Sequence, residues 1–287
     1  MTDLEKFLAR AESLLARVET LLPAAQPAID WNAHAFRWKK SGGRGWLQAV
    51  LHPHAIRLED LHDIDAQKEQ VERNTRQFVL RRGANNVLLT GARGTGKSSL
   101  VKALLNRHAP DGLRLIEVDK ADLSDLPDIV DLIAGRPERF IIFCDDLSFE
   151  ASEAGYKALK SVLDGSVAAV PDNVLLYATS NRRHLMPEYF EDNRDTRHED
   201  GEIHPGEAVE EKISLSDRFG LWLSFYPFDQ EAYVRIVNGW LKEFGLPDAE
   251  IEAARAPALL WALTRGSRSG RSAWQFARDY AGQWMTP

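Results

Sequence analysis

The sequence predicts an α/β protein built on a parallel five-stranded sheet with helices on both faces. Two observations lead to this prediction. Short apolar runs alternate with stretches of helical period, which is typical of parallel sheets. A glycine-rich turn separates the first of these runs from a helical stretch. The runs expected to be strands are residues 86–90, 113–118, 140–144, 174–179 and 221–226.

The glycine-rich turn, residues 91–98, matches the phosphate-binding pattern G-x-x-x-x-G-K-[ST] at every fixed position. Its glycines let backbone N–H groups face phosphate oxygens, and the following helix directs its positive end at them. Lys97 would neutralise the β- and γ-phosphates, and Ser98 would complete a Mg²⁺ shell. A turn that merely needs glycines is the alternative, which the flanking strand and helix disfavour. The expected nucleotide contacts are Gly91, Arg93, Gly94, Thr95, Gly96, Lys97, Ser98 and Ser99.

Paired carboxylates follow the third expected strand. We assign Asp145, with Ser98, to the metal, and Asp146 to the water that attacks the γ-phosphate. The alternative for this pair is an acidic helix cap. Asn181 follows the fourth expected strand and is the candidate for orienting the same water, although an isolated asparagine there is usually turn chemistry.

Helical stretches are expected at both ends of the chain. Four follow Phe228, at 230–244, 249–256, 258–265 and 272–284, with Pro257 among the breaks. Near the N-terminus, apolar residues from Leu4 to Leu22 step by four and three, which predicts an amphipathic helix that packs on the core or on a neighbouring subunit. The expected division is an N-terminal helical segment (1–50), a nucleotide-binding αβα domain (51–227) and a helical lid (228–287).

Composition narrows the class of protein. The 287 residues, 44% hydrophobic and 28% charged, suit a globular protein, and no apolar run approaches the roughly 18 residues of a membrane span. One cysteine, Cys144, permits no internal disulfide, so we expect a cytoplasmic protein. The net charge of −7 argues against a basic nucleic-acid binder. Residues 188–212 hold ten acidic and three basic residues, which accounts for the whole net negative charge of the chain. They are expected to form a solvated loop.

One further motif brings the chain close to a known family. Asp217-Arg218-Phe219-Gly220 precedes the fifth strand, and together with the phosphate loop, the paired aspartates, Asn181 and the helical tail it resembles the AAA+ ATPases. The strings 85–89, 93–100 and 204–220 look like those of an uncharacterised bacterial AAA+ family, a domain of unknown function. The resemblance implies that Arg218 is a finger reaching a neighbour's nucleotide, worth about 10³–10⁵ in turnover. The alternative is a surface arginine paired with Asp217 or the acidic loop.

The same resemblance implies two more contacts and exposes one departure. Arg271 is similar to the lid arginine of the family, with Arg268 close by, and Ile64 lies in the segment that wraps adenine. The preference for ATP over GTP rests on this likeness alone. Most AAA+ enzymes have Asp-Glu where this chain has Asp145-Asp146. The shorter side chain predicts a different reach to the water or slow turnover, and Glu150 is a candidate substitute.

Three functions follow from these patterns. The first is an oligomeric, Mg²⁺-dependent ATPase that remodels a protein partner, built as a ring for which six copies is one candidate number. The second, not favoured, is a nucleic-acid motor or loader, suggested by the aromatic and basic residues between Trp31 and Trp46. Packing is the preferred interpretation of that segment. The third is an ATP-gated scaffold with weak turnover, suggested by Asp146.

Overall fold

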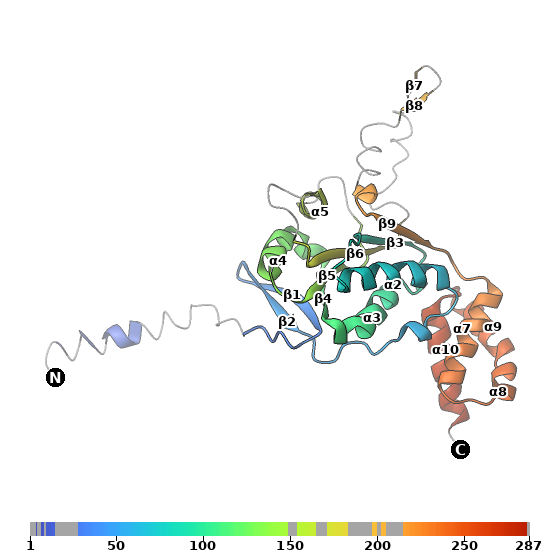
Figure 1. Ribbon diagram of the computed structural model, residues 1–287. Coiled ribbons are helices and arrows are strands. Elements are labelled where there is room, and N and C mark those ends of the chain that lie inside the picture. Colours follow the sequence, from blue (N-terminus) through green and yellow to red (C-terminus); the bar gives the residue numbers. More distant parts are fainter. Residues whose placement is uncertain are drawn as a thin grey trace.

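The computed structural model describes residues 4, 7–8, 10–14, 28–148, 154–164, 171–182, 197–199, 202–204 and 215–285. Its centre is a seven-stranded sheet in the order β2-β1-β4-β5-β6-β3-β9, with helices on both faces (Figure 1). Every neighbouring pair is parallel except β1 and β2. The predicted parallel sheet is therefore confirmed, and it contains two strands more than the five expected.

The five predicted strands lie side by side. They are β3 (Val87–Gly91), β4 (Leu113–Glu117), β5 (Arg139–Cys144), β6 (Val174–Ser180) and β9 (Leu221–Phe225). Strands β5 and β6 are buried along their whole length, because they lie in the middle of the sheet and both of their faces are covered. Cys144 ends β5, and burial raises the pKa of its thiol to about 12.

The two additional strands correct the expectation of a helical segment over residues 1–50. Residues 35–49 form a hairpin of β1 (Ala35–Ser41) and β2 (Arg44–Ala49), and β1 pairs with β4 at the edge of the sheet. The hairpin turn is Gly42-Gly43, and both glycines have positive φ, +58° and +78°. Such a two-residue glycine turn matches the twist of paired strands. This signal was present in the sequence.

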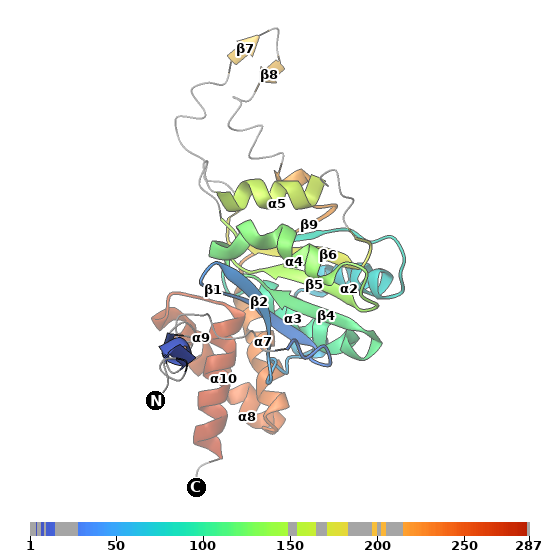
Figure 2. The ribbon, with the colours of Figure 1, turned by 90° about the vertical axis from the view of Figure 1, so that its left-hand side faces the viewer.

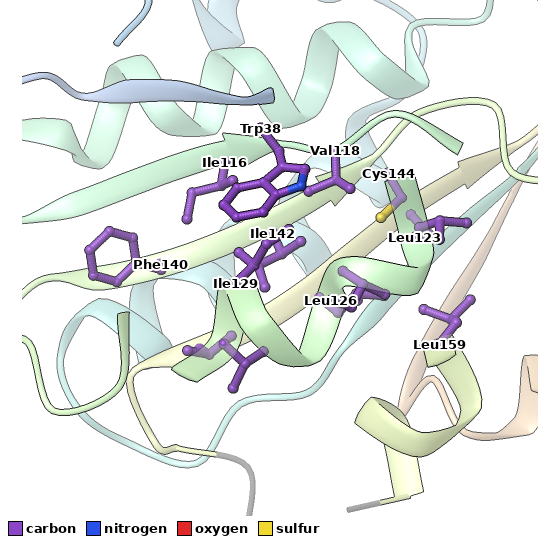
Figure 3. Packing of buried hydrophobic residues seen from close by; sticks show 14 of the residues in the cluster. Trp38, Ile116, Val118, Leu123, Leu126, Ile129, Phe140, Ile142, Cys144 and Leu159 are labelled. Carbon is purple, nitrogen blue, oxygen red and sulfur yellow. The ribbon is translucent and has the colours of Figure 1, made fainter. Parts of the chain in front are cut away.

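Two pairs of helices cover the sheet (Figures 1 and 2). Helices α2 (Asp65–Val79) and α3 (Lys97–His108) pack on one face, and α4 (Leu126–Ile133) and α5 (Ala154–Asp164) on the other. Figure 3 shows the hydrophobic core on the face covered by α4 and α5, where residues of these helices meet those of β1, β4 and β5. Each fully buried large apolar side chain contributes about 1.5–3 kcal/mol. The short helical turns are η1 (Leu58–Asp60), η2 (Ala109–Asp111) and η3 (Lys120–Asp125).

The aromatic residues between Trp31 and Trp46 serve this core. Phe36 and Trp38 are buried, and the Trp38 indole Nε1 donates to Asp125 at 3.1 Å. Trp31 packs edge-on against Phe140 with its ring centroid 6.2 Å away. Packing is thus the role of Trp31, Phe36 and Trp38, although they pack against the sheet and η3 rather than against the N-terminal helix.

A buried polar network joins α2 to the start of β3. Asn74 exchanges two hydrogen bonds of 2.9 Å with the backbone of Asn85, and its amide also donates to the Tyr177 hydroxyl at 3.1 Å. Thr75 bonds the same hydroxyl at 2.9 Å. Asn86 accepts from the Leu176 backbone at 2.8 Å. We call these residues, Asn74, Thr75, Asn85, Asn86 and Tyr177, the amino-end network.

The chain after the sheet forms four helices with a hydrophobic core of their own. They are α7 (Gln230–Glu243), α8 (Asp248–Ala253), α9 (Arg255–Thr264) and α10 (Gly270–Trp284), and we refer to them as the lid. The predicted break at Pro257 is wrong, because α9 begins two residues earlier. A proline in the first turn of a helix is tolerated, since the N–H groups there have no partner within the helix.

The lid touches the sheet domain through polar contacts. Arg235 on α7 pairs with Asp63, and Glu243 pairs with Arg57 at 2.7 Å. The acidic segment 188–212 lies outside the described residues except for a short antiparallel pair, β7 (Arg197–Glu199) and β8 (Glu202–His204). Glu150 also lies outside them. Among the described helices, none combines the length and apolarity needed to cross a membrane.

Candidate nucleotide site

The phosphate-binding turn connects β3 to α3 at the carboxyl edge of the sheet. Gly91, Gly94 and Gly96 all have positive φ, at +126°, +72° and +95°. A Cβ at Gly91 would lie 1.9 Å from the Phe225 carbonyl oxygen, and one at Gly94 would lie 2.6 Å from Ser269 Cβ. Both conformation and space therefore require glycine at Gly91 and Gly94.

Lys97 begins α3, and its buried ammonium group is enclosed by the turn. The Nζ atom donates to the carbonyl oxygens of Gly91 and Ala92 at 2.8 and 2.7 Å and to Asn181 Oδ1 at 3.1 Å. Burial lowers the pKa of Lys97, and the nearby charges of Asp146 and Asp145 oppose that shift. All three hydrogen-bond acceptors are neutral, so the ammonium lacks a hydrogen-bonded anion in this arrangement.

Asp145 lies at the centre of a second set of hydrogen bonds. Its Oδ1 accepts from the Ser98 hydroxyl at 2.6 Å and from the Thr179 hydroxyl at 2.5 Å. The sequence predicts that Ser98 and Asp145 share one Mg²⁺ site, and the structure brings their side chains together. Thr179 is not among the predicted site residues. Its position near the end of β6, a strand whose carboxyl end is expected to lie at the same edge of the sheet as that of β5, indicates that it could reach Asp145.

Asp146 and Asn181 complete the arrangement. Asp146 is exposed, with a φ of +53° that is rare outside glycine, and its backbone N–H donates to Thr179 Oγ1 at 2.9 Å. The Asn181 amide donates to Asp146 Oδ1 at 2.5 Å while its oxygen accepts from Lys97. We call the residues Lys97, Ser98, Asp145, Asp146, Thr179 and Asn181 the loop cluster.

The remaining residues predicted to contact the nucleotide lie beside the phosphate-binding turn, with the exception of Arg218. Ile64 is buried, and its Cδ1 lies 3.4 Å from a Cβ built at Gly96. Thr95 donates to the Ala92 carbonyl at 2.8 Å, Ser99 lies in the first turn of α3, and Arg93 is exposed. Arg218 is paired with Asp164 on α5, outside the loop cluster.

The lid reaches the turn through its backbone. The Gly270 N–H donates to the Gly94 carbonyl oxygen at 2.7 Å, and Ser269 caps α10 by accepting from the Ser272 N–H at 3.2 Å. Arg268 and Arg271 flank this contact, and both are exposed. The contact of the lid with the turn in this arrangement comes from Gly270, and the role predicted for Arg271 stays a prediction.

The donor set suits Mg²⁺. Among the described residues there is no group of three or more His, Cys, Asp or Glu that could hold a metal. Magnesium differs from metals that need such a group, because it is usually held by one or two protein oxygens together with water and substrate phosphates. The Ser98 hydroxyl and Asp145 carboxylate, 2.6 Å apart beside the ammonium of Lys97, supply those two oxygens.

The comparisons place the chain in a family. Residues 31–284 match the family described as Protein of unknown function (DUF815). The chain belongs to the DUF815 family. No curated protein matches it. The predicted resemblance to an uncharacterised AAA+ family is confirmed by this match together with the fold.

Solved structures identify the fold. A proline-to-glycine mutant of RuvB from Thermotoga maritima has 13% identity and a TM-score of 0.51 over 78% of this chain and 64% of that chain. The chain thus spans less than two thirds of RuvB. The HORMA:CdnC:Trip13 complex of E. coli MS115-1 is also similar, with 15% identity and a TM-score of 0.48 over 80% of this chain and 91% of that chain. RuvB is an AAA+ ATPase, and the DUF815 chain has the AAA+ fold.

Proposed function

We propose that this DUF815 protein is a Mg²⁺-dependent ATPase that assembles into oligomers and acts on a protein partner. One observation carries the proposal: the buried ammonium of Lys97 has only neutral hydrogen-bond acceptors, at the turn where a phosphate would supply the anion. Charge-assisted hydrogen bonds to phosphate oxygens are roughly twice as strong as neutral ones. A triphosphate would therefore replace the carbonyl oxygens of Gly91 and Ala92 as partners of Lys97.

The other members of the loop cluster fit the steps of hydrolysis. Ser98 and Asp145 would hold Mg²⁺, which neutralises charge on the phosphates when it is bound. Asp146 is exposed beside this pair, where its carboxylate would accept a proton from the attacking water. Asn181 bonds both Asp146 and Lys97, so it would orient the water relative to the γ-phosphate. Ile64, against the turn, would contact the base.

Isothermal titration calorimetry on the full chain tests the binding step. We expect Mg·ATP to bind the wild-type protein, and Lys97→Ala to weaken this binding at least about 100-fold through loss of charge-assisted hydrogen bonds. Lys102→Ala, on the same helix α3, removes the same charge at a different position and should bind as the wild type does. A parallel titration with Mg·GTP tests the preference for adenine. Equal affinities of the two lysine variants would contradict the proposal.

The oligomeric step has its own test. A finger that acts on a neighbour predicts a turnover per subunit that rises with protein concentration, and Arg218→Ala should remove that rise. In the monomer Arg218 is paired with Asp164, so a trans role requires this ion pair to break on assembly. Turnover that is independent of concentration and of Arg218 would leave the finger without support.

The weakly hydrolysing scaffold remains the second candidate. The left-handed backbone of Asp146 and its hydrogen bond to Asn181 favour it, since both restrict a carboxylate that is already one methylene shorter than the glutamate of most AAA+ enzymes. Tight Mg·ATP binding with a turnover that stays near background would support the scaffold over the ATPase. The nucleic-acid motor has less support than the sequence alone gives it, because Phe36 and Trp38 are buried in the core and cannot stack on bases.

A further inference from the structure

The lid carries an open groove between α9 and α10. Its volume is about 640 Å³, and Trp261, Arg265, Trp274 and Arg278 are among the residues that line it. The Arg265 guanidinium lies 4.4 Å from the Trp261 ring centroid, and that of Arg278 lies 5.3 Å from the Trp274 centroid. Gly282 also lines the groove, and a Cβ built there would meet no atom within 4 Å. Asp279 lines the groove as well, so two arginines and one aspartate leave it aromatic, unfilled and with a net positive charge.

The groove lies in the basic part of an acidic chain. Residues 255–287 contain five basic residues and one acidic residue, namely Arg255, Arg265, Arg268, Arg271, Arg278 and Asp279. The ion pairs formed within the described residues include Arg255 with Glu231 but neither Arg265 nor Arg278. These two arginines can therefore each take a carboxylate from an incoming segment.

The N-terminal segment has the opposite properties. Its described residues are helical, and four of its large apolar side chains are more than half exposed: Leu4, Phe7, Leu8 and Leu14. An amphipathic helix gains most of its stability from burying its apolar face. This face is unburied in the chain by itself, which leaves it available to a partner.

The acidic residues of this segment follow a regular spacing. Glu5, Glu12 and Glu19 recur every seven residues, which is close to two helical turns, so in a continuous helix they form a row along one border of the apolar face. A helix laid in the lid groove would place apolar side chains on the tryptophans and this row beside Arg265 or Arg278. Apolar surface and charge are thus both complementary.

We propose that the N-terminal helix of one copy of the chain docks into the α9–α10 groove of a second copy. The sheet topology favours a second copy, because the N-terminal segment enters at the β1–β2 edge and the lid leaves from β9 at the opposite edge. A contact between opposite edges joins copies head to tail. This contact requires neither ATP binding nor hydrolysis, so it can fail or hold independently of the proposed function.

Sedimentation velocity of the full chain without nucleotide tests the contact. We expect concentration-dependent assembly of the wild type, and dissociation constants at least about tenfold higher for Leu8→Asp and Gly282→Phe. The first variant places a charge on the apolar face, and the second fills the groove while improving helix propensity over glycine. The matched controls are Ser13→Asp, on the opposite side of the same helix, and Gly282→Ala, which adds only a Cβ. Both should assemble as the wild type does.

A mixing experiment decides whether the contact is between copies, and a charge swap tests the pairing of Glu12 with Arg278. Leu8→Asp chains have an intact groove, and Gly282→Phe chains have an intact helix, so a mixture should form dimers that neither variant forms alone. Glu12→Arg and Arg278→Glu should each weaken assembly, and chains that carry both should recover it. Calorimetry should find Mg·ATP binding unchanged in Leu8→Asp, which separates this contact from the nucleotide site.

Several results would overturn the proposal. They are a wild-type chain that stays monomeric at tens of micromolar, assembly that is insensitive to Leu8→Asp and Gly282→Phe, and a mixture of these variants that remains monomeric. Titration with a 20-residue oligothymidylate covers the alternative occupant. If it binds the wild type, fails to bind Gly282→Phe and is unaffected by Leu8→Asp, the groove is a nucleic-acid site and the helix is not its occupant.

Discussion

The two ends of the central sheet each hold a set of bonded polar side chains, but the two sets differ in kind. In the amino-end network all groups are neutral, and the side chains of Asn74 and Asn86 bond backbone just before β3 and in β6. In the loop cluster a buried ammonium and two carboxylates lie close together, but each is hydrogen-bonded only to neutral groups: carbonyl oxygens of the turn, hydroxyls and the Asn181 amide. A neutral network bonded to backbone would gain no stronger hydrogen bonds from rearranging. A charged cluster would form stronger, charge-assisted hydrogen bonds if a polyanion replaced its neutral partners.

This comparison separates stability from function. Substitutions in the amino-end network should lower the free energy of unfolding and leave nucleotide binding intact. Substitutions in the loop cluster should act on binding and turnover with small effects on folding.

Asp146→Asn should have the largest effect, on turnover alone. Loss of a general base lowers hydrolysis by about 10²–10⁴-fold. The amide retains the size of the carboxylate, so ATP should still bind, and single-turnover assays would find it trapped. Asp172→Asn makes the same change beyond the amino end of β6 and should hydrolyse ATP at the wild-type rate. Equal turnover of the two variants would remove Asp146 from the mechanism.

Asn74→Ala should be the most damaging change to stability. It removes two part-buried hydrogen bonds to Asn85 and one to the buried Tyr177 hydroxyl, at a cost of about 2–4 kcal/mol. Urea unfolding measures this loss, and Asn32→Ala, at an exposed site, is the control. The dissociation constant for Mg·ATP should not change in the folded variant. A large change there would mean that the two ends are coupled.

Asp164→Asn should raise turnover modestly, whereas Asp146→Asn lowers it. It weakens the ion pair that holds Arg218 within its own chain. Partly exposed pairs of this kind are worth about 0.2–1 kcal/mol, so turnover below the saturating protein concentration should rise about 1.4- to fivefold. Glu231→Gln, which weakens the Arg255 pair within the lid, should leave turnover unchanged. A fall in turnover would show that Asp164 assists the finger rather than restrains it.

His108, at the far end of α3, should give the smallest effect. Burial lowers the pKa of its imidazole from the ordinary 6.5, although Glu72 and Asp111 oppose the shift. The unfolded chain therefore takes up a proton before the folded one, and stability should fall as the pH drops through 6.5. Thermal unfolding between about pH 7.5 and 5.5 measures this slope, which His108→Gln should reduce. An unchanged slope would assign the effect to other groups.

Much of the fold was predictable because each feature is local in the sequence. The five strands and the turn at 91–98 depend on short apolar runs and on glycines followed by Lys97 and Ser98. The hairpin at 35–49 is hard to predict because its tryptophans also suit a ligand surface or a docking surface, although Gly42-Gly43 is typical of a strand turn. The start of α9 is hard to predict because Pro257, which suggests a break, is tolerated in the first turn of a helix.

The site was harder to predict because its geometry depends on contacts between strands. Thr179 bonds Asp145 only because β5 and β6 are neighbours, which the sequence does not specify. Asn181 was identified, but its bridge between Lys97 and Asp146 depends on the carboxyl ends of β3, β5 and β6 lying together. The roles assigned to Arg218 and Arg271 remain predictions, since both require a second copy or a bound nucleotide.

The hydrogen bond from Gly270 to Gly94 bears on how the lid would respond to a phosphate bound at the turn. Gly270 is the first residue of α10, as Lys97 is of α3, so the positive ends of two helix dipoles converge on one turn. An anion held there would be attracted by both, each by about 0.3–1 kcal/mol, and tilting the lid would alter only the second attraction. Loss of the γ-phosphate would therefore loosen the lid without any side chain having to carry the signal.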